Sequence, residues 1–197
     1  MCLEIWKLSN LLTFIGLIFS IMGLQMCFNE MHNIAIILLI LSGICDTFDG
    51  YVANKFKKTE KEKEYGIQLD SLVDIISSGI FPIVFCLSMG FNHIIDIIVY
   101  SFFAICGITR LVYFNINTKK DNKAFIGIPI TVSTMLFPIL YLLTKNEIIY
   151  IISMLLLALL YISKIKINKP NIFHKIFLSL CGIILIIFIL LRTGGII

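Results

Sequence analysis

The sequence predicts an all-α protein, a polytopic transmembrane helical bundle, and three observations support that fold class. Hydrophobic residues make up 59% of the 197 residues and charged residues only 14%, whereas soluble domains carry roughly 25% charged residues. The mean hydropathy is +1.00. The apolar residues fall in seven runs, most of them close to the length that a membrane helix needs. A membrane strand would instead alternate polar and apolar residues over about ten positions.

Each expected helix is an apolar run between polar breaks. The first run follows Lys7 in the manner of a signal peptide, but no small-residue cleavage site comes after it, so we expect a first membrane helix there. The fifth and sixth runs are separated only by residues 144–146. The seven expected helices are 9–28, 33–54, 67–89, 93–116, 127–144, 147–163 and 172–191.

Basic residues gather at alternate breaks between the runs. If the N-terminus lies in the cytoplasm, the outer segments contain only Lys145 and Arg192. The cytoplasmic segments then contain thirteen lysines, which are Lys7, Lys55, Lys57, Lys58, Lys61, Lys63, Lys119, Lys120, Lys123, Lys164, Lys166, Lys169 and Lys175. Such a bias is typical of membrane proteins of this orientation. We expect a multi-pass protein of the cell membrane that contacts the lipid bilayer, and the net charge of +4 does not indicate nucleic acid.

Four aspartates lie well inside expected helices, where an ionised carboxylate costs about 2.5–3.5 kcal/mol, whereas Asp96 only begins its helix at the outer face. Asp46 and Asp49 are spaced i, i+3 in the second helix, and Asp70 and Asp74 are spaced i, i+4 in the third. Each pair therefore lies on one helix face. At ~1.5 Å per residue, each pair is about 13–15 Å from the cytoplasmic end of its helix, so the four carboxylates share one depth.

Four carboxylates at one depth repel one another unless cations lie between them. Oxygen ligands suit Mg²⁺, Mn²⁺ or Ca²⁺, and no histidine or cysteine joins the group to favour zinc or copper. Divalent ions held in this way commonly clamp phosphates. Gly50, Ala53 and Gly66 adjoin the acids and would let a ligand approach the backbone, although packing between helices is the alternative explanation for these small residues.

Two segments resemble the signature of the CDP-alcohol phosphatidyltransferases, D-x-x-D-G-x-x-A-R…G-x-x-x-D-x-x-x-D. They are Asp46-Thr-Phe-Asp49-Gly50-Tyr-Val-Ala53 and Gly66-Ile-Gln-Leu-Asp70-Ser-Leu-Val-Asp74. The resemblance implies a six-helix family core at 1–163. Residues 164–197 would add a basic cytoplasmic linker and a seventh, C-terminal hydrophobic helix. The resemblance also implies that the four aspartates bind a divalent metal, Mg²⁺ or Mn²⁺. Homodimers are common among such proteins.

The chain departs from this signature at its arginine, which is Asn54 here. The resemblance implies that this arginine would help to hold the nucleotide diphosphate. Eleven residues separate Asn54 from Gly66, a longer stretch than is usual. Lys55, or another lysine of this longer loop, is the candidate substitute, as a point charge without the guanidinium fork.

The wider context resembles the family members that use serine, which read Gly-x-x-Leu-Asp-Ser-Leu-x-Asp-x-x-Ser-x-Gly. The chain has Gly66-Ile-Gln-Leu-Asp70-Ser-Leu-Val-Asp74-Ile-Ile-Ser77-Ser-Gly79. This implies phospholipid synthesis, by transfer of a phosphatidyl group from CDP-diacylglycerol to the hydroxyl of L-serine with release of CMP. Glycerol 3-phosphate and inositol phosphate are the alternative acceptors.

The resemblance also implies roles for single residues. Asp74 would act as the general base, besides binding metal. Gly50, Ala53, Lys55 and Gly66 would contact the nucleotide diphosphate, and Asn10 and Thr13 are at positions where relatives often contact the nucleotide.

Lys175 lies near the start of the last expected helix, so Arg110 is the one basic residue deep inside an expected helix. The free-energy cost of a charge at that depth predicts that Arg110 faces a polar cavity. We hypothesise that it binds a substrate anion, either the serine carboxylate or a phosphate, with Asn115 and Ser77 as polar contacts. A structural ion pair with an aspartate, or snorkelling to the interface, is the alternative explanation.

A small transporter of cations or protons is the competing class of function. Such a protein would spread its carboxylates across the bilayer to make a path. The four aspartates share one depth instead, which favours the enzyme.

Overall fold

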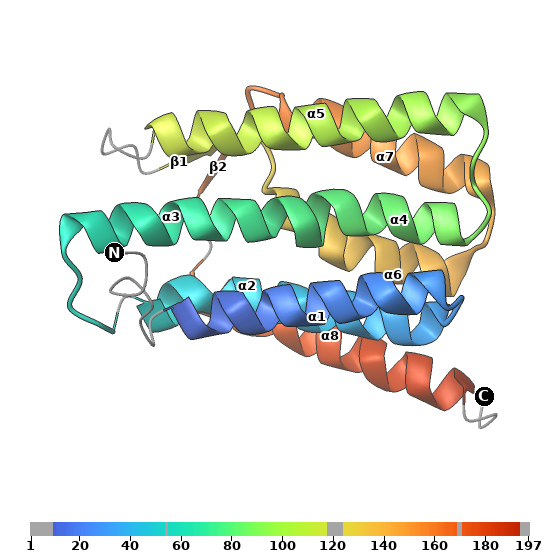
Figure 1. The fold of residues 1–197 in the computed structure, drawn as a ribbon, viewed down its shortest axis with the longest axis horizontal. Helices are drawn as coiled ribbons and strands as arrows, with labels where there is room; N and C mark the ends of the chain where they lie inside the picture. The colour runs from blue at the N-terminus through green and yellow to red at the C-terminus, as the bar shows by residue number, and fades with distance from the viewer. Residues whose placement is uncertain (1–9, 54, 118–123, 169–170, 194–197) are drawn as a thin grey trace.

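The computed structural model of the protein describes residues 10–53, 55–117, 124–168 and 171–193, and it is a helical bundle (Figure 1). Its helices are α1 (Leu11–Phe28), α2 (His32–Ala53), α3 (Glu60–Asp74), α4 (Phe81–Ser88), α5 (Ile94–Asn117), α6 (Ser133–Leu143), α7 (Glu147–Tyr161) and α8 (Ile172–Thr193). A π-helix, η3 (Ile75–Ile80), joins α3 to α4, and a 3₁₀ turn, η4 (Ile130–Val132), precedes α6. The all-α prediction is confirmed, with one small exception. Two three-residue strands, β1 (Ala124–Ile126) and β2 (Lys166–Asn168), pair antiparallel.

Five of the seven predicted helices are long and apolar enough to cross a membrane: α1, α2, the continuous α3–η3–α4, α5 and α8. The predicted fifth and sixth helices are the shorter α6 and α7. Large apolar side chains such as Ile105, Phe177 and Ile184 are exposed on the outer surface. A water-soluble surface rarely carries contiguous apolar area of this extent, so the chain is a multi-pass membrane protein.

Helices α1 and α2 pack closely because small residues line their contact. A Cβ added to Gly16 would lie 3.6 Å from the carbonyl oxygen of Ser42. The hydroxyls of Ser20 and Ser42 are 2.8 Å apart. A Cβ on Gly23 would collide with the ring of Phe81 in α4. Small residues at such contacts let helix backbones approach in a membrane.

Helix α3 begins seven residues before the predicted third helix, so the expectation of a loop around Glu60, Glu62 and Glu64 is wrong. Thr59 forms a capping box with Glu62, in which each side chain binds the other residue's backbone N–H. This arrangement satisfies two N–H groups that a helix start leaves unpaired. In Figure 1, α3 projects beyond the neighbouring ends of α1 and α5.

The π-helix η3 follows Asp74 directly and depends on an external hydrogen bond. Pro82 has no N–H, so the carbonyl of Ser78 lacks the donor that an α-helix would supply four residues later. The hydroxyl of Ser133 donates to that carbonyl at 2.7 Å. Single π-turns inside helices are frequent at functional sites, and this one borders the aspartates of α3.

Gly127 gives a test of the packing between the β1–η4 segment and α7. Its φ is +78°, and an added Cβ would collide with the carbonyl oxygen of Tyr161. Gly90 has a φ of +89° with nothing within 4 Å of an added Cβ. Both Gly→Ala variants incur a left-handed backbone penalty of about 1–2 kcal/mol. We therefore expect Gly127→Ala to lower the thermal unfolding midpoint in detergent clearly more than Gly90→Ala. Equal midpoints for the two variants would contradict the collision.

Candidate active site

Three carboxylates from α2 and α3 converge between the helices. Ligand oxygens of Asp46, Asp49 and Asp70 all lie within 4.8 Å of one another. The fourth, Asp74, is 7% exposed and interacts electrostatically with the other three. The structure therefore brings the four predicted aspartates together as one acid cluster, as their helical spacing indicated.

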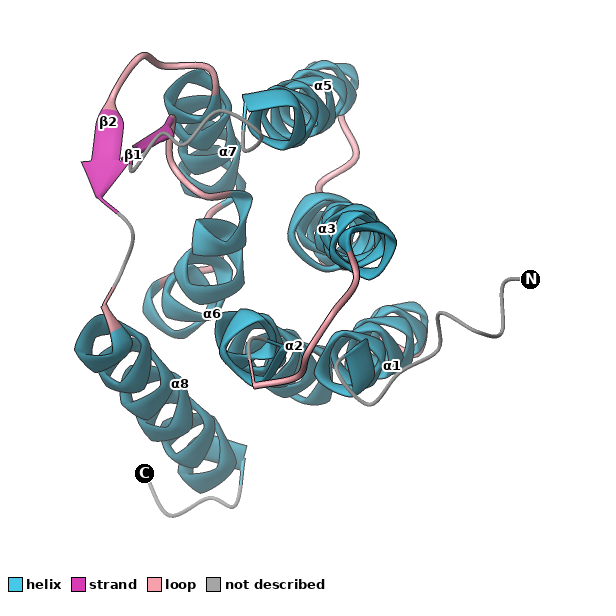
Figure 2. Cartoon of the chain, turned by 90° about the vertical axis from the view of Figure 1, so that its left-hand side faces the viewer, coloured by secondary structure: helices cyan, strands magenta, loops and turns pink. Residues whose placement is uncertain are grey.

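Helices α1 and α8 supply groups that compensate the acid cluster. The hydroxyl of Thr13 in α1 donates to Asp49 Oδ2 at 2.9 Å, within the protein interior. From α8, Lys175 Nζ donates to the carbonyl oxygen of Thr47 at 3.0 Å. The same ammonium attracts Asp46 and Asp70. Figure 2 shows α8 beside α2 and α6, so the last helix contributes a cation to the cluster.

Arg110 of α5 lies on the Asp74 side of the acid cluster. It is 7% exposed, and its charge interacts with those of Asp74 and Asp46. Its guanidinium carbon lies 5.2 Å from the ring centroid of Phe114. Its Nε is buried without a hydrogen-bond partner. A buried donor without a partner is costly, so this nitrogen is suited to an anionic ligand.

The acid cluster has the composition and size of a divalent-metal site. A cavity of about 10 Å³ adjoins Asp46, Asp49 and Asp70, with Ser77 on its wall. A space of this order is comparable with one water molecule. Two oxygens on opposite sides of an Mg²⁺ ion are about 4.2 Å apart, and the ligand oxygens of the three carboxylates lie within 4.8 Å of one another. The acid cluster could therefore hold a divalent metal ion.

A larger cavity of about 440 Å³ opens beside the acid cluster. Its wall contains five of the residues predicted to contact the nucleotide, together with two acids, two lysines and two apolar residues; all eleven are Asn10, Thr13, Asp49, Gly50, Ala53, Phe56, Lys58, Lys63, Gly66, Ile67 and Asp70. An added Cβ on Gly50 would meet nothing within 4 Å, so that glycine leaves open space at the wall.

The predicted cation, Lys55, is not part of this wall. Its Nζ lies 4.8 Å from the ring centroid of Tyr51. Lys58 and Lys63 line the cavity instead, and the sequence alone did not single them out among the lysines of the loop. Asn54 lies outside the described residues.

The two predicted polar contacts of Arg110 lie apart from each other. Ser77 donates to the carbonyl of Val73 at 3.1 Å and borders the small cavity. Asn115 Nδ2 donates to the hydroxyl of Ser71 at 2.9 Å and lines a separate cavity of about 720 Å³. The Asn115–Ser71 pair joins α5 to α3 next to Asp70, so it helps to position the acid cluster.

A second group of ionisable residues joins the N-terminal ends of α5 and α7. His93 Nδ1 lies 2.8 Å from Glu147 Oε1, and the His93 backbone N–H donates to Asp96 Oδ2 at 2.8 Å. The hydrogen bond to Glu147, together with the charge of that residue, raises the pKa of His93. The group connects α5 to α7 and caps α5, which is a sufficient structural reason for these residues.

The fold and the acid cluster define an integral membrane enzyme with an acidic site for divalent metal. The model of the CDP-alcohol phosphatidyltransferase family matches residues 6–165, and the chain belongs to that family. Helix α8 lies beyond the matched range.

Curated relatives are named as enzymes of this family that use serine. This chain is 39% identical to the CDP-diacylglycerol–serine O-phosphatidyltransferase of Methanocaldococcus jannaschii, over 73% of this chain and 70% of the relative. The enzyme of that name from Helicobacter pylori is 31% identical over 94% of this chain and 81% of the relative. The archaetidylserine synthase of Methanothermobacter thermautotrophicus is 31% identical over 68% of this chain and 58% of the relative.

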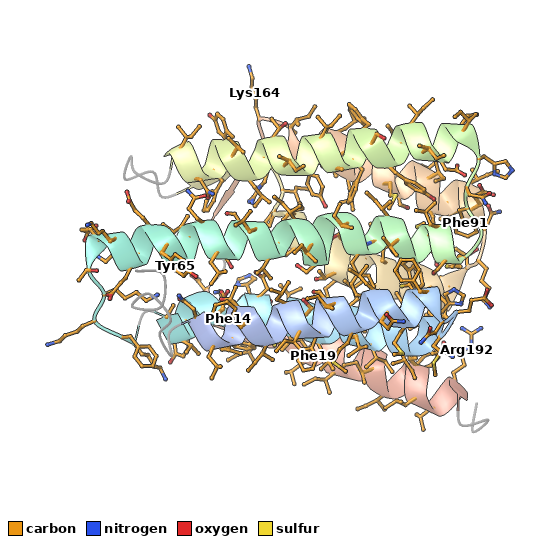
Figure 3. All side chains as sticks on the ribbon, in the orientation of Figure 1. Phe14, Phe19, Tyr65, Phe91, Lys164 and Arg192 are labelled. Atoms are coloured by element: carbon orange, nitrogen blue, oxygen red, sulfur yellow. The ribbon has the colours of Figure 1, made fainter. Side chains whose placement is uncertain are left out.

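Lys175→Met tests whether α8 compensates the charge of the acid cluster. In metal-free protein we expect a loss of about 1 kcal/mol, or roughly 2–4 °C in the unfolding midpoint for a chain of this size. Saturating Mn²⁺ should reduce the loss, because the ion then neutralises the carboxylates. Lys164→Met is the control, since Lys164 points away from the bundle (Figure 3). A Lys175→Met shift that is the same with and without Mn²⁺ would make Lys175 a packing contact only.

Proposed function

We propose that this enzyme transfers a phosphatidyl group from CDP-diacylglycerol to the hydroxyl of L-serine and releases CMP. The observation that carries the proposal is the position of Arg110, whose buried guanidinium interacts with Asp74 at the edge of the acid cluster. A cation for the acceptor's carboxylate and a base for its hydroxyl are thereby adjacent. The names of the relatives support serine as the acceptor.

The 440 Å³ cavity is the proposed place of the nucleotide diphosphate. The absence of side chains at Gly50 and Gly66 leaves room for phosphate oxygens near the backbone. Asn10 and Thr13 offer polar groups at the start of α1, and the small side chain of Ala53 leaves further room at the wall. The two acids of this wall, Asp49 and Asp70, connect the cavity to the acid cluster.

The four aspartates are the proposed ligands of the divalent metal, Mg²⁺ or Mn²⁺. When bound, such an ion neutralises the diphosphate and stabilises the negative charge that develops on the leaving group. Positioning and charge neutralisation supply most of the catalysis in phosphoryl transfer. The residues that remain to be assigned are those that bind and deprotonate the acceptor.

Asp74 is the proposed general base. Its carboxylate removes the proton from the serine hydroxyl, and the serine oxygen forms a bond to the lipid-side phosphorus. The bond from that phosphorus to the bridging oxygen breaks, and the electron pair leaves with CMP. Arg110 holds the serine carboxylate through charge-assisted hydrogen bonds, with Ser77 beside the reacting centre and Asn115 fixing α5 against α3.

The donor lipid reaches the acid cluster from the bilayer, and serine arrives from the cytoplasmic side. This orientation rests on the thirteen lysines that the sequence places on that side. One relative is named for an archaetidyl rather than a phosphatidyl product, so an ether-linked donor belongs in the assay. Assembly as a homodimer in the cell membrane is part of the same proposal.

The test is CMP release by purified protein given labelled CDP-diacylglycerol and Mn²⁺. We expect release that requires serine and is absent with glycerol 3-phosphate or inositol phosphate. Asp74→Asn should insert and fold but lose roughly 10²- to 10⁴-fold in turnover, the usual contribution of a general base. Glu30→Gln is the control, because it removes an exposed carboxylate in the connection between α1 and α2, outside the acid cluster. Release with another acceptor, or full turnover in Asp74→Asn, would overturn the corresponding assignment.

Arg110→Lys tests the acceptor site separately. Lysine keeps the charge but loses the planar fork, so we expect the KM for serine to rise by about ten- to a hundredfold. The KM for CDP-diacylglycerol should change little, because the nucleotide cavity does not include Arg110. Unchanged serine kinetics in this variant would exclude Arg110 from serine binding.

A further inference from the structure

We propose that Lys58, from the loop between α2 and α3, binds the phosphates of the nucleotide in the 440 Å³ cavity. The inference rests on the proposed function, since it concerns the same nucleotide. The role is that of a substrate-binding residue, and the ligand chemistry is a nucleoside diphosphate anion. Neither the family match nor the sequence motif assigns this residue.

The negative charge on the cavity wall has to be offset by a cation if a diphosphate is to bind there. Asp49 and Asp70 are both on its wall, and a diphosphate brought next to them adds further negative charge. A metal ion held by the acid cluster would neutralise the diphosphate only on the side that faces the aspartates. The described basic residues on the cavity wall are Lys58 and Lys63, so one of them is needed for the opposite side.

Lys63 is already engaged with a neighbouring acid. Its Nζ lies 2.7 Å from Glu60 Oε1, and both side chains are largely exposed on the first turns of α3. An exposed i, i+3 pair of this kind is weak, but it directs the Lys63 ammonium along the outside of the helix. Lys58 is the better placed of the two lysines.

The ammonium of Lys58 reaches into the wall of the cavity. It lies 3.7 Å from the position that a Cβ on Gly66 would take, and Asn10 Oδ1 is at the same distance from that position. Lys58 also interacts with Asp49. A cation, a side-chain amide and a glycine without a side chain thus meet at one place, which is where a phosphate could approach the backbone.

Partial burial supports this assignment. Desolvation lowers the pKa of Lys58, while the charges of Asp49 and Glu62 oppose that shift. The adjacent Lys57 is exposed and is not on the cavity wall. A less hydrated ammonium loses less solvation when an anion arrives, so Lys58 is better prepared than Lys57 to bind phosphate.

Equilibrium binding of CDP to the purified full chain, with and without Mg²⁺, tests the proposal. We expect Lys58→Met to weaken CDP binding by roughly ten- to a hundredfold, in both conditions. Lys57→Met should bind as the wild type does. The KM for CDP-diacylglycerol should rise in Lys58→Met while the KM for serine stays constant, a division that general misfolding would not produce.

A rescue variant gives a second measurement. Asn54→Arg in the Lys58→Met background places a guanidinium at the position where the signature has arginine, and we expect it to recover part of the lost CDP affinity. Equal CDP affinity in Lys58→Met and Lys57→Met would overturn the role of Lys58 and leave the proposed function intact. A wild-type protein that neither binds CDP nor releases CMP would instead overturn the proposed function, and the Lys58 assignment with it.

Discussion

The structure depends on placing four carboxylates among apolar helices. An uncompensated charge in such surroundings is expensive, and four at one depth also repel one another. Their presence therefore requires nearby positive charge, hydrogen-bond donors and bound cations. The close contact of α1 with α2, the long α3 and the π-helix after Asp74 all serve to keep these carboxylates together. Away from the acid cluster, the core of the described residues is mainly aromatic and aliphatic, and the group of His93, Asp96 and Glu147 satisfies its charges within itself.

The two cavities beside the acid cluster differ in size and lining, and each suits a different ligand. The small one, of about 10 Å³, is enclosed by acids and hydroxyls and suits an ion. The larger one, of about 440 Å³, has small residues and lysines on its wall and suits a phosphate-bearing nucleotide. Arg110 approaches from α5, on a helix that does not contribute to either wall. The proposed acceptor and donor therefore reach the aspartates from different helices.

Much of the fold and the centre of the site could be predicted from the sequence. Run length gave the seven helices, and the i, i+3 and i, i+4 spacings gave the convergence of the aspartates. The sequence contains the capping-box residues Thr59 and Glu62, but the charged residues around them predicted a loop instead of a helix start. The sequence offered the lysines of the loop as a group but not the choice of Lys58 among them, and it did not indicate Lys175, because the position of each at the site depends on tertiary contacts. In a chain with apolar residues on all sides, periodicity also does not separate the lipid-facing surface from the core.

The origin of the compensating groups couples the site to the assembly of the bundle. Asp49 receives its hydrogen bond from Thr13 on α1, Asp46 is attracted by Lys175 on α8, and Arg110 comes from α5. Helix α1 is joined to α2 by residues 29–31, and α5 follows α4 after residues 89–93, whereas α8 comes from far along the chain. The charges of the acid cluster are therefore fully compensated only when all three helices have packed. A divalent ion held by the acid cluster would stabilise the same arrangement, because it would bind the assembled carboxylates and not the separated ones. One network of charges consequently links folding, metal affinity and the position of Asp74, the proposed general base.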